Sequence, residues 1–176
     1  RAERLGEADA GVLGGAIDRA PDVFLGFNDA FLAEPVVVRV PAGIAVGGPV
    51  VVAHLTEGDG LAAFPRLVVE AGDDSEVSVL EIQASGVEPG LVVPVTEIAV
   101  GRAARVGHLT VQQLGLATWQ LGLQVASVEA DASLRTTTVG FGGDYARLRT
   151  DCRMVGRGAT GELDAVYFGE GEQTLD

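Results

Sequence analysis

The chain has 176 residues and a formal net charge of −13, from 25 acidic residues against 12 basic residues that are all arginines. A surface of this sign repels phosphate backbones and anionic lipids, which argues against nucleic-acid and membrane partners. The single cysteine, Cys152, can form no internal disulfide, so a disulfide-rich secreted scaffold is excluded and a cytoplasmic protein is expected. No apolar run approaches the ~18 residues that cross a bilayer.

Residues 1–33 form the first predicted unit, a helical lead-in. Leu5, Leu13 and Ile17 fall near helical spacing, and Pro21 interrupts the pattern, so we expect two short helices. The N-terminus lacks the layout of a signal peptide. Because the only methionine is Met154, we expect a segment of a longer protein.

Residues 34–176 form the second predicted unit, a β-domain. Hydrophobic residues make up 47% of the chain but aromatic residues only 5%, so Val, Leu, Ile and Ala must fill the interior. Runs of β-branched residues separated by Gly, Pro and Asp turns predict short strands, and no amphipathic helix lies between them to form βαβ units. The predicted strands are 36–40, 44–54, 66–70, 76–83, 91–99, 104–111, 121–128, 133–139, 144–155 and 162–168.

A weak internal repeat underlies these strands. A small residue recurs at positions 45, 75, 104, 132 and 159, in steps of 30, 29, 28 and 27 residues. A small side chain at one fixed point of each repeat suits a solenoid, because stacked coils leave little room at their corners. The sequence therefore predicts a β-solenoid, with a β-sandwich or jelly roll as the alternative.

The segment Gly156–Gly161 matches the dinucleotide-binding pattern G-x-G-x-x-G letter for letter. That fingerprint requires a helix after its last glycine, whereas residues 162–168 alternate between apolar and polar as a strand does. Only 15 residues follow Gly161, too few for a βαβ unit. We therefore expect a glycine-rich corner of the solenoid.

Cys152, His54 and His108 are the side chains with the richest possible chemistry. A lone cysteine inside a strand is more often a small buried hydrophobe than a reactive thiolate. The two histidines show no H-x-H or H-E-x-x-H spacing, so each is expected to be a hydrogen-bonded polar residue. In a solenoid, His108 with Gln112 or Gln113 could approach a neighbouring coil.

Two pairs of carboxylates, Asp73 with Asp74 and Glu162 with Asp164, could in principle serve acid–base chemistry or hold calcium. Neighbouring carboxylates at turns usually face water. No P-loop, nucleophile elbow or ordered Ser/His/Asp set is present. We therefore assign no catalytic, cofactor-binding or metal-binding residue and expect that the chain is not an enzyme.

Several segments in order resemble the SufB/SufD family of the SUF iron–sulfur cluster assembly system. The first runs from Asn28, Ala30 and Phe31 through Val40-Pro41-Ala42-Gly43 to Pro49 and the strand at 50–54. The later ones are 64–69 with Glu76, Val77 and Glu81; 96–98 with Gly101, Ala104, His108 and Gln113; Gly142-Gly143 with Arg147; and Gly156, Gly158 and Ala159 with Gln173 and Asp176. The likeness extends from about residue 24 to the last residue.

Within the family, the chain resembles SufD more than SufB. SufB-like proteins carry a cysteine just after the Arg-Leu-Val-Val strand, whereas the corresponding stretch here, Glu81–Ser85, has none. The resemblance implies a right-handed parallel β-helix (solenoid) preceded by a short helical N-terminal segment. In full-length members the β-helix continues beyond the position of Asp176 and a helical segment follows it, so this chain is expected to be truncated.

The resemblance also implies a role and partners. It implies a non-catalytic scaffold that pairs with a SufB-like subunit and a SufC-like ATPase, with a transient iron–sulfur cluster only at the level of the assembled complex. No cluster ligand is carried over to a residue of this segment.

Two other functions are compatible with the architecture: a carbohydrate-active β-helix and a generic β-solenoid or β-sandwich binding domain. The first needs carboxylates stacked on adjacent coils. Here Asp73 and Asp74 are followed one repeat later by Arg102 and Ala103, so no acidic column is expected.

Overall fold

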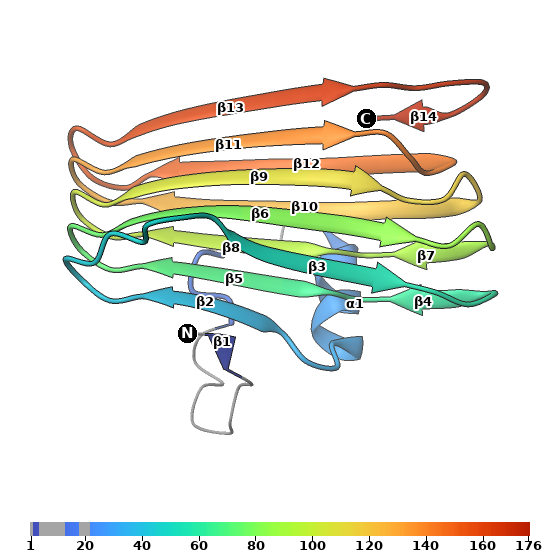
Figure 1. Cartoon of the computed structure of the whole chain (residues 1–176), viewed down its shortest axis with the longest axis horizontal. Helices are drawn as coiled ribbons and strands as arrows, with labels where there is room; N and C mark the ends of the chain where they lie inside the picture. The colour runs from blue at the N-terminus through green and yellow to red at the C-terminus, as the bar shows by residue number, and fades with distance from the viewer. Residues whose placement is uncertain (1, 4–12, 18–21) are drawn as a thin grey trace.

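The computed structural model describes residues 2–3, 13–17 and 22–176, which form a parallel β-solenoid of about five turns with one short helix (Figure 1). Each turn contributes at least one strand to each of two facing sheets. Within both sheets the neighbouring strands are parallel, except for the short antiparallel pair β1–β2. No helix among these residues is long and apolar enough to cross a membrane.

The first sheet, sheet A, has nine strands and the second, sheet B, has five. Sheet A contains β1 (Ala2–Glu3), β2 (Val36–Val40), β4 (Leu61–Ala63), β5 (Arg66–Ala71), β7 (Gly90–Val92), β8 (Val95–Val100), β10 (Thr118–Val128), β12 (Tyr145–Met154) and β14 (Thr174–Leu175). Sheet B contains β3 (Val50–Thr56), β6 (Glu76–Ser85), β9 (Arg105–Gln113), β11 (Ser133–Gly140) and β13 (Thr160–Tyr167).

The apolar core lies between the sheets and consists of columns of small aliphatic side chains. One column on sheet A runs through Val38, Val69, Ile98, Ala126 and Cys152, which are direct neighbours on successive strands. The first four of these residues are buried, and Cys152 packs against the same cluster. Aliphatic side chains thus fill the space between the two closely spaced sheets, so few aromatic residues are needed.

The predicted repeat is the corner that leads from sheet A to sheet B. Positions 43, 74, 103, 131 and 158 all have positive φ, and in each case the next residue donates its backbone N–H to the carbonyl three residues earlier, as Ala104 does to Gly101 at 3.1 Å. The buried small residues that follow are Ser75, Ala104 and Ala132, which confirms these repeat positions. The first position was wrong by one residue: Ala45 bridges to Glu76, so Ile44 is the equivalent of Ser75. The segment Gly156–Gly161 forms the last corner and the start of β13.

Most predicted strands lie where expected, and the differences have local causes. The run 91–99 is split into β7 and β8 at Val93-Pro94, because proline has no N–H to donate to a neighbouring strand. The run 44–54 begins only at Val50, after an irregular stretch that contains Gly47, Gly48 and Pro49. The short strands β4 and β14 were not predicted.

The N-terminal prediction is only partly tested. Helix α1 (Val23–Phe31) corresponds to the second predicted helix, and Asp22 caps it by accepting hydrogen bonds from Phe24 N and Leu25 N. Residues 2–3 are a strand rather than a helix. The remainder of the first predicted helix falls largely in 4–12, outside the described residues.

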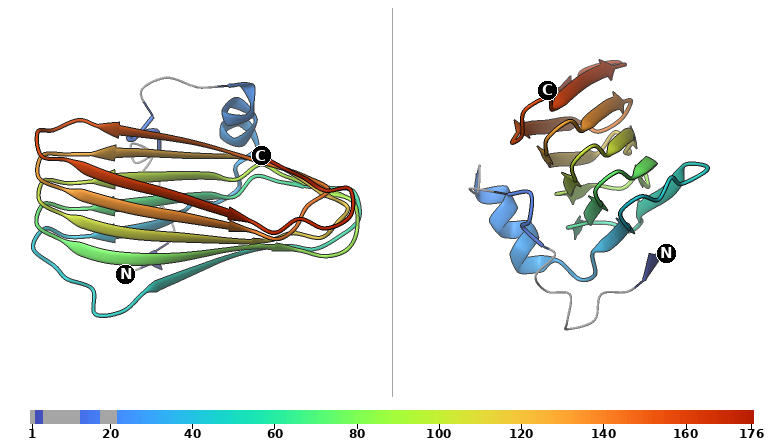
Figure 2. Two further views of the ribbon diagram at one scale, coloured as in Figure 1. Left: turned by 90° about the horizontal axis from the view of Figure 1, so that it is seen from above. Right: turned by 90° about the vertical axis from the view of Figure 1, so that its left-hand side faces the viewer.

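Helix α1 and residues 13–17 lie on the outer side of sheet A (Figure 2). Leu25 of α1 and Ala16 pack with Val95, Leu123 and Val125, which are outward-facing residues of β8 and β10. At the other extreme of the chain, all residues of β13 are exposed. Its inward-facing Leu163 and Tyr167 remain 47% and 41% accessible, because no further turn covers them among the described residues.

Candidate functional site

The interior of the solenoid is apolar near the starts of the sheet B strands and polar farther along them. Strand β6, for example, points Val77 and Val79 inward and then Glu81 and Gln83. The same change from apolar to polar occurs on the neighbouring strands. We call the polar half of the interior the polar lumen; its buried members are Glu81, Gln83, Thr96, His108, Thr110, Gln112, Gln120, Gln124, Thr136 and Thr138.

Glu81 is the centre of the polar lumen and is only 1% exposed. Its Oε1 accepts a hydrogen bond from Gln83 Nε2 at 2.8 Å. Its Oε2 accepts one from Thr96 Oγ1 at 3.0 Å and contacts His108 Nε2 at 3.1 Å. The donors come from β6 itself and from the next turn of the solenoid, so the Glu81 carboxylate links two successive turns.

His108 extends this arrangement to a third coil. Its Nδ1 lies 3.3 Å from Thr136 Oγ1, which accepts a hydrogen bond from Gln124 Nε2 at 2.8 Å. If Nε2 of a neutral ring donates to Glu81, then Nδ1 accepts from the Thr136 hydroxyl, and this assignment of the tautomer satisfies every member. The hydrogen bonds then all run in one direction, from Gln124 through Thr136 and His108 to Glu81.

The surroundings of Glu81 at the end of this chain of hydrogen bonds favour its ionised form. Burial by itself raises the pKa of Glu81, but the hydrogen bonds from His108 and Gln83 and the electrostatic influence of the His108 and His54 rings together hold the pKa below its ordinary value. His54 behaves differently, because burial lowers the pKa of its ring and Glu81 offsets this only in part. The Nε2 atom of His54 lies 3.7 Å from Glu81 Oε1, and the described residues offer it no hydrogen bond.

Glutamine side chains continue the network along the lumen. Gln120 Nε2 donates to Gln83 Oε1 at 2.6 Å. Gln112 binds the loop after β11, because its amide donates to Gly142 O and accepts from Gly142 N, both at 2.8 Å. The neighbouring Gln113 faces outward and is exposed, so of the two glutamines only Gln112 reaches another coil from inside.

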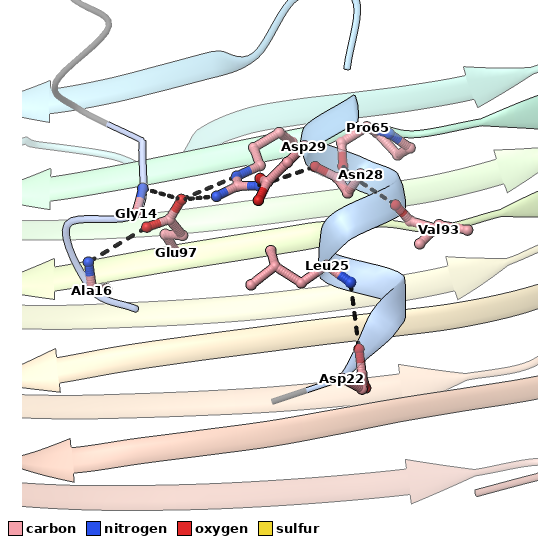
Figure 3. Close-up of polar contacts among 10 residues, drawn as sticks. Gly14, Ala16, Asp22, Leu25, Asn28, Asp29, Pro65, Val93 and Glu97 are labelled. Atoms are coloured by element: carbon pink, nitrogen blue, oxygen red, sulfur yellow. Dashed lines mark hydrogen bonds and ion pairs between the residues drawn. The ribbon is translucent and has the colours of Figure 1, made fainter. Parts of the chain in front are cut away.

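A second buried polar cluster lies on the opposite side of sheet A and holds the N-terminal segment (Figure 3). Arg66 is 1% exposed and donates from Nε and Nη2 to Glu97 Oε1, at 3.0 and 2.5 Å. Glu97 also accepts from the backbone N–H of Gly14 at 2.9 Å and Ala16 at 3.4 Å. Asn28 donates to Val93 O at 2.8 Å and accepts from Arg66 Nη1 at 3.1 Å. We call this cluster the N-terminal latch; it comprises Arg66, Glu97, Asn28, Asp29, Gly14 and Ala16.

The polar lumen holds a hydrogen-bonded Thr–His–Glu arrangement, but the described residues place neither a cysteine nor a metal site there. No group of three or more His, Cys, Asp or Glu side chains in the described ranges is placed to hold a metal ion. Cys152 belongs to the apolar half of the interior, and burial raises the pKa of its thiol. A raised pKa keeps a thiol protonated and poorly reactive.

The predicted carboxylate pairs lie on the surface. Asp73 forms an ion pair with Arg102 on the next coil at 2.8 Å, which lowers the pKa of Asp73 and confirms that no acidic column builds up. Glu162 and Asp164 lie 3.4 and 3.7 Å from the guanidinium group of Arg135. None of these carboxylates points into the lumen.

The central role of Glu81 and the whole latch were not predicted from the sequence. A signal for Glu81 is present, because it occupies an inward position in a strand whose other inward residues include Val77 and Val79. Arg66 and Glu97 also sit in strands that are almost entirely buried. A charged residue inside an otherwise apolar run predicts a paired, buried charge.

Comparison with known proteins identifies the family. The family model described as "SUF system FeS cluster assembly, SufBD core domain" matches residues 54–176. Iron–sulfur cluster assembly SufBD family proteins of Mycobacterium bovis and Mycobacterium tuberculosis are 31% identical over 177 residues, which cover 98% of this chain and 42% of each relative. The chloroplastic protein ABCI7 of Arabidopsis thaliana is 24% identical over 164 residues, covering 88% of this chain and 34% of that protein.

The chain thus spans less than half the length of the curated relatives it matches. The family match includes the whole polar lumen and the last four of the five solenoid corners. With this match and the parallel β-solenoid, the chain belongs to the SufBD core family of the SUF iron–sulfur cluster assembly system.

Proposed function

We propose that the chain is a SufD-like scaffold segment, a non-catalytic part of a cytoplasmic complex that contains a SufB-like subunit and a SufC-like ATPase. Membership of the SufBD core family supports a role in iron–sulfur cluster assembly. The scaffold role, the SufB-like and SufC-like partners and the cytoplasmic location are proposed in addition to this family-level role. The cluster is the cargo of the assembled complex and is held by residues outside this segment.

The arrangement of β6 supports the scaffold role over a sulfur-accepting one. SufB-like proteins resemble this chain but carry a cysteine on the corresponding strand. Here Gln83 occupies an inward position of β6, and its amide is engaged at both ends, with Glu81 and Gln120. A sulfur acceptor needs an accessible thiolate, whereas the single cysteine of the chain, Cys152, packs against the apolar core.

Size-exclusion chromatography with purified SufB-like and SufC-like subunits tests the proposal. The chain and a version extended beyond Asp176 are each mixed with the two subunits. We expect the extended form to elute with both partners, and the 176-residue chain to bind more weakly. Failure of both forms to bind would show that the family likeness describes the fold and not the role.

A cysteine variant tests the non-catalytic part of the proposal separately. Cys152→Ala in the extended form is expected to leave complex formation and the yield of assembled cluster unchanged, because the thiol is not used. Normal complex formation together with a loss of cluster yield would assign Cys152 to sulfur handling and would overturn the scaffold role.

A further inference from the structure

The two sheets differ in what covers their outer faces. The single helix of the described residues, α1, packs on sheet A with residues 13–17 (Figure 2). Nothing in the described part of the chain packs in this way on the outer face of sheet B, which exposes large apolar side chains, among them Val51 at 57% and Leu55 at 71%. An exposed apolar face of this kind is typical of an interaction surface.

Outward-facing apolar side chains, some exposed and some half-buried, form continuous columns across sheet B. One column runs over all five strands through Ala53, Ile82, Val111, Val139 and Val166, which are direct neighbours in the strand register. On one side it is flanked by Val51, Leu80 and Leu109, and on the other by Leu55 and Ala84. We call these ten residues the apolar stripe.

The loops that follow the sheet B strands form an acidic border beside the stripe. They comprise residues 57–60, 86–89, 114–117, 141–144 and 168–173, and they contain no arginine or lysine. Their carboxylates are all exposed, and we call this set the acidic rim: Glu57, Asp59, Glu88, Asp144, Glu170 and Glu172.

The opposite border of the stripe has no comparable net charge. It is a shallow groove of about 400 Å³ whose lining includes Glu76, Arg105, Arg135 and Glu162. There Arg105 pairs with Glu76 at 3.9 Å and Arg135 with Glu162 at 3.4 Å. The attraction of this face for a positive charge is therefore stronger on the rim side, where no arginine or lysine offsets the carboxylates.

We propose that the apolar stripe and the acidic rim bind an amphipathic helix of a partner protein, with the helix lying across the strands and its basic flank facing the rim. Five strands at about 4.8 Å spacing span about 19 Å, which is the length of about 13 helical residues. A second copy of the chain is a poorer occupant, because it would bring two charges of −13 together.

A pair of dye-labelled peptides tests the proposal, which does not depend on the scaffold role. Both are 14-residue helices with leucines on one face; one carries lysines on the flank and the other glutamates. Fluorescence anisotropy with the 176-residue chain should show at least tenfold tighter binding of the lysine peptide, weakening as salt is raised. Equal affinity for the two peptides would overturn the charge assignment.

Variants locate the binding to this face. Val51→Glu and Leu55→Glu change exposed residues of the stripe and should each weaken lysine-peptide binding at least tenfold. Val23→Glu is the matched control, because Val23 is 62% exposed on α1, on the other side of the molecule. The affinity of the Val23→Glu variant for the lysine peptide should remain within twofold of that of the parent chain. An equal loss in all three variants, or a concentration-dependent dimer that the stripe variants abolish, would overturn the proposal.

Glu88→Lys tests the rim, and Glu76→Lys is its control at the opposite border, with the same change in net charge. We expect the first to weaken binding at least threefold more than the second. Equal effects would show that the peptide responds to the overall charge of the chain and not to the rim. Circular dichroism of every variant confirms that the solenoid remains folded.

Discussion

At the scale of single residues, Glu81 shows how this solenoid accommodates a charge in its interior. A carboxylate that is 1% exposed would be strongly destabilising without partners, because burial removes its hydration. Here Gln83, Thr96 and His108 direct hydrogen bonds at it from two turns of the solenoid. The combined effect lowers the pKa of Glu81, so the fold favours the ionised over the protonated form.

A neutral isostere at this position should therefore be destabilising. Glu81→Gln keeps the shape but replaces one accepting oxygen by an N–H₂ group that faces donors. We expect the free energy of unfolding to fall by about 2 kcal/mol, as measured by urea denaturation. Glu162→Gln is the control, because Glu162 is 60% exposed and its replacement should change stability by less than about 0.5 kcal/mol. Similar values for the two variants would contradict the role given to Glu81.

The chemistry of the lumen was only partly predictable, because strand alternation gives the direction of a side chain but not its partners. The expectation that His108 is hydrogen-bonded agrees with its contacts to Glu81 and Thr136. The same expectation for His54 fails at Nε2, which has no hydrogen-bond partner among the described residues. Predicting such partners requires an alignment of neighbouring turns that is correct to a single residue. The alignment of the repeat was wrong by one position at Ala45.

At the scale of elements, α1 depends on the latch more than on its own sequence. The helix has nine residues, too short to be stable alone in water, and only Leu25 and Asn28 are buried. Asn28 donates to the carbonyls of Pro65 and Val93, at the points where β5 and β8 are about to begin. The Pro65 carbonyl also accepts a hydrogen bond from Val95 N at 3.0 Å, so the side chain of Asn28 fixes the helix to backbone carbonyls at the starts of two neighbouring strands.

Removing this amide should release the helix. Asn28→Ala deletes both donated hydrogen bonds and leaves Arg66 Nη1 with Asp29 alone, so we expect a loss of about 2–3 kcal/mol. Hydrogen exchange should become faster in 23–31 and 13–17 while the sheet strands stay protected. Asp29→Ala is the neighbouring control: Asp29 is 57% exposed and its loss should cost less than about 1 kcal/mol. Unchanged exchange in α1 after Asn28→Ala would refute this account.

The strands were more predictable than the helices for a physical reason. A strand such as β2 is specified by its own β-branched residues, Val36, Val37, Val38 and Val40. Helix α1 is specified by partners 37 to 65 residues away, as in the bonds from Asn28 to Pro65 and Val93. The local sequence pattern therefore predicted the strands of the solenoid, whereas the position of α1 on sheet A depends on long-range contacts.

At the scale of the whole molecule, acid acts on the solenoid through two opposing effects. Lowering the pH reduces the net charge of −13 and so relieves repulsion across the surface. It also titrates the lumen, where His54 and Glu81 both have pKa values below their ordinary ones. For both groups the unfolded chain binds protons more readily than the folded chain, so their contributions to stability are lost as pH falls.

The loss should come in two windows. The contribution of His54 is complete above its ordinary pKa of 6.5 and declines as pH falls from there toward the lower pKa of the folded state. The contribution of Glu81 is complete above its ordinary pKa of 4.5 and declines below it. Urea denaturation from pH 8 to pH 4 should therefore show the free energy of unfolding beginning to decrease near pH 6.5.

His54→Gln separates this effect from the change in surface charge. The variant leaves the carboxylates that dominate the surface in place, so the relief of repulsion is unchanged, but it removes the ring that resists protonation. We expect the difference in unfolding free energy between parent and variant to be constant above pH 7 and to shift in favour of the variant as pH falls below 6.5. A difference that stays constant from pH 8 to pH 5 would show that His54 takes up protons equally well in the folded and unfolded chain. Its unpartnered Nε2 beside Glu81 would then have no bearing on the acid sensitivity of the fold.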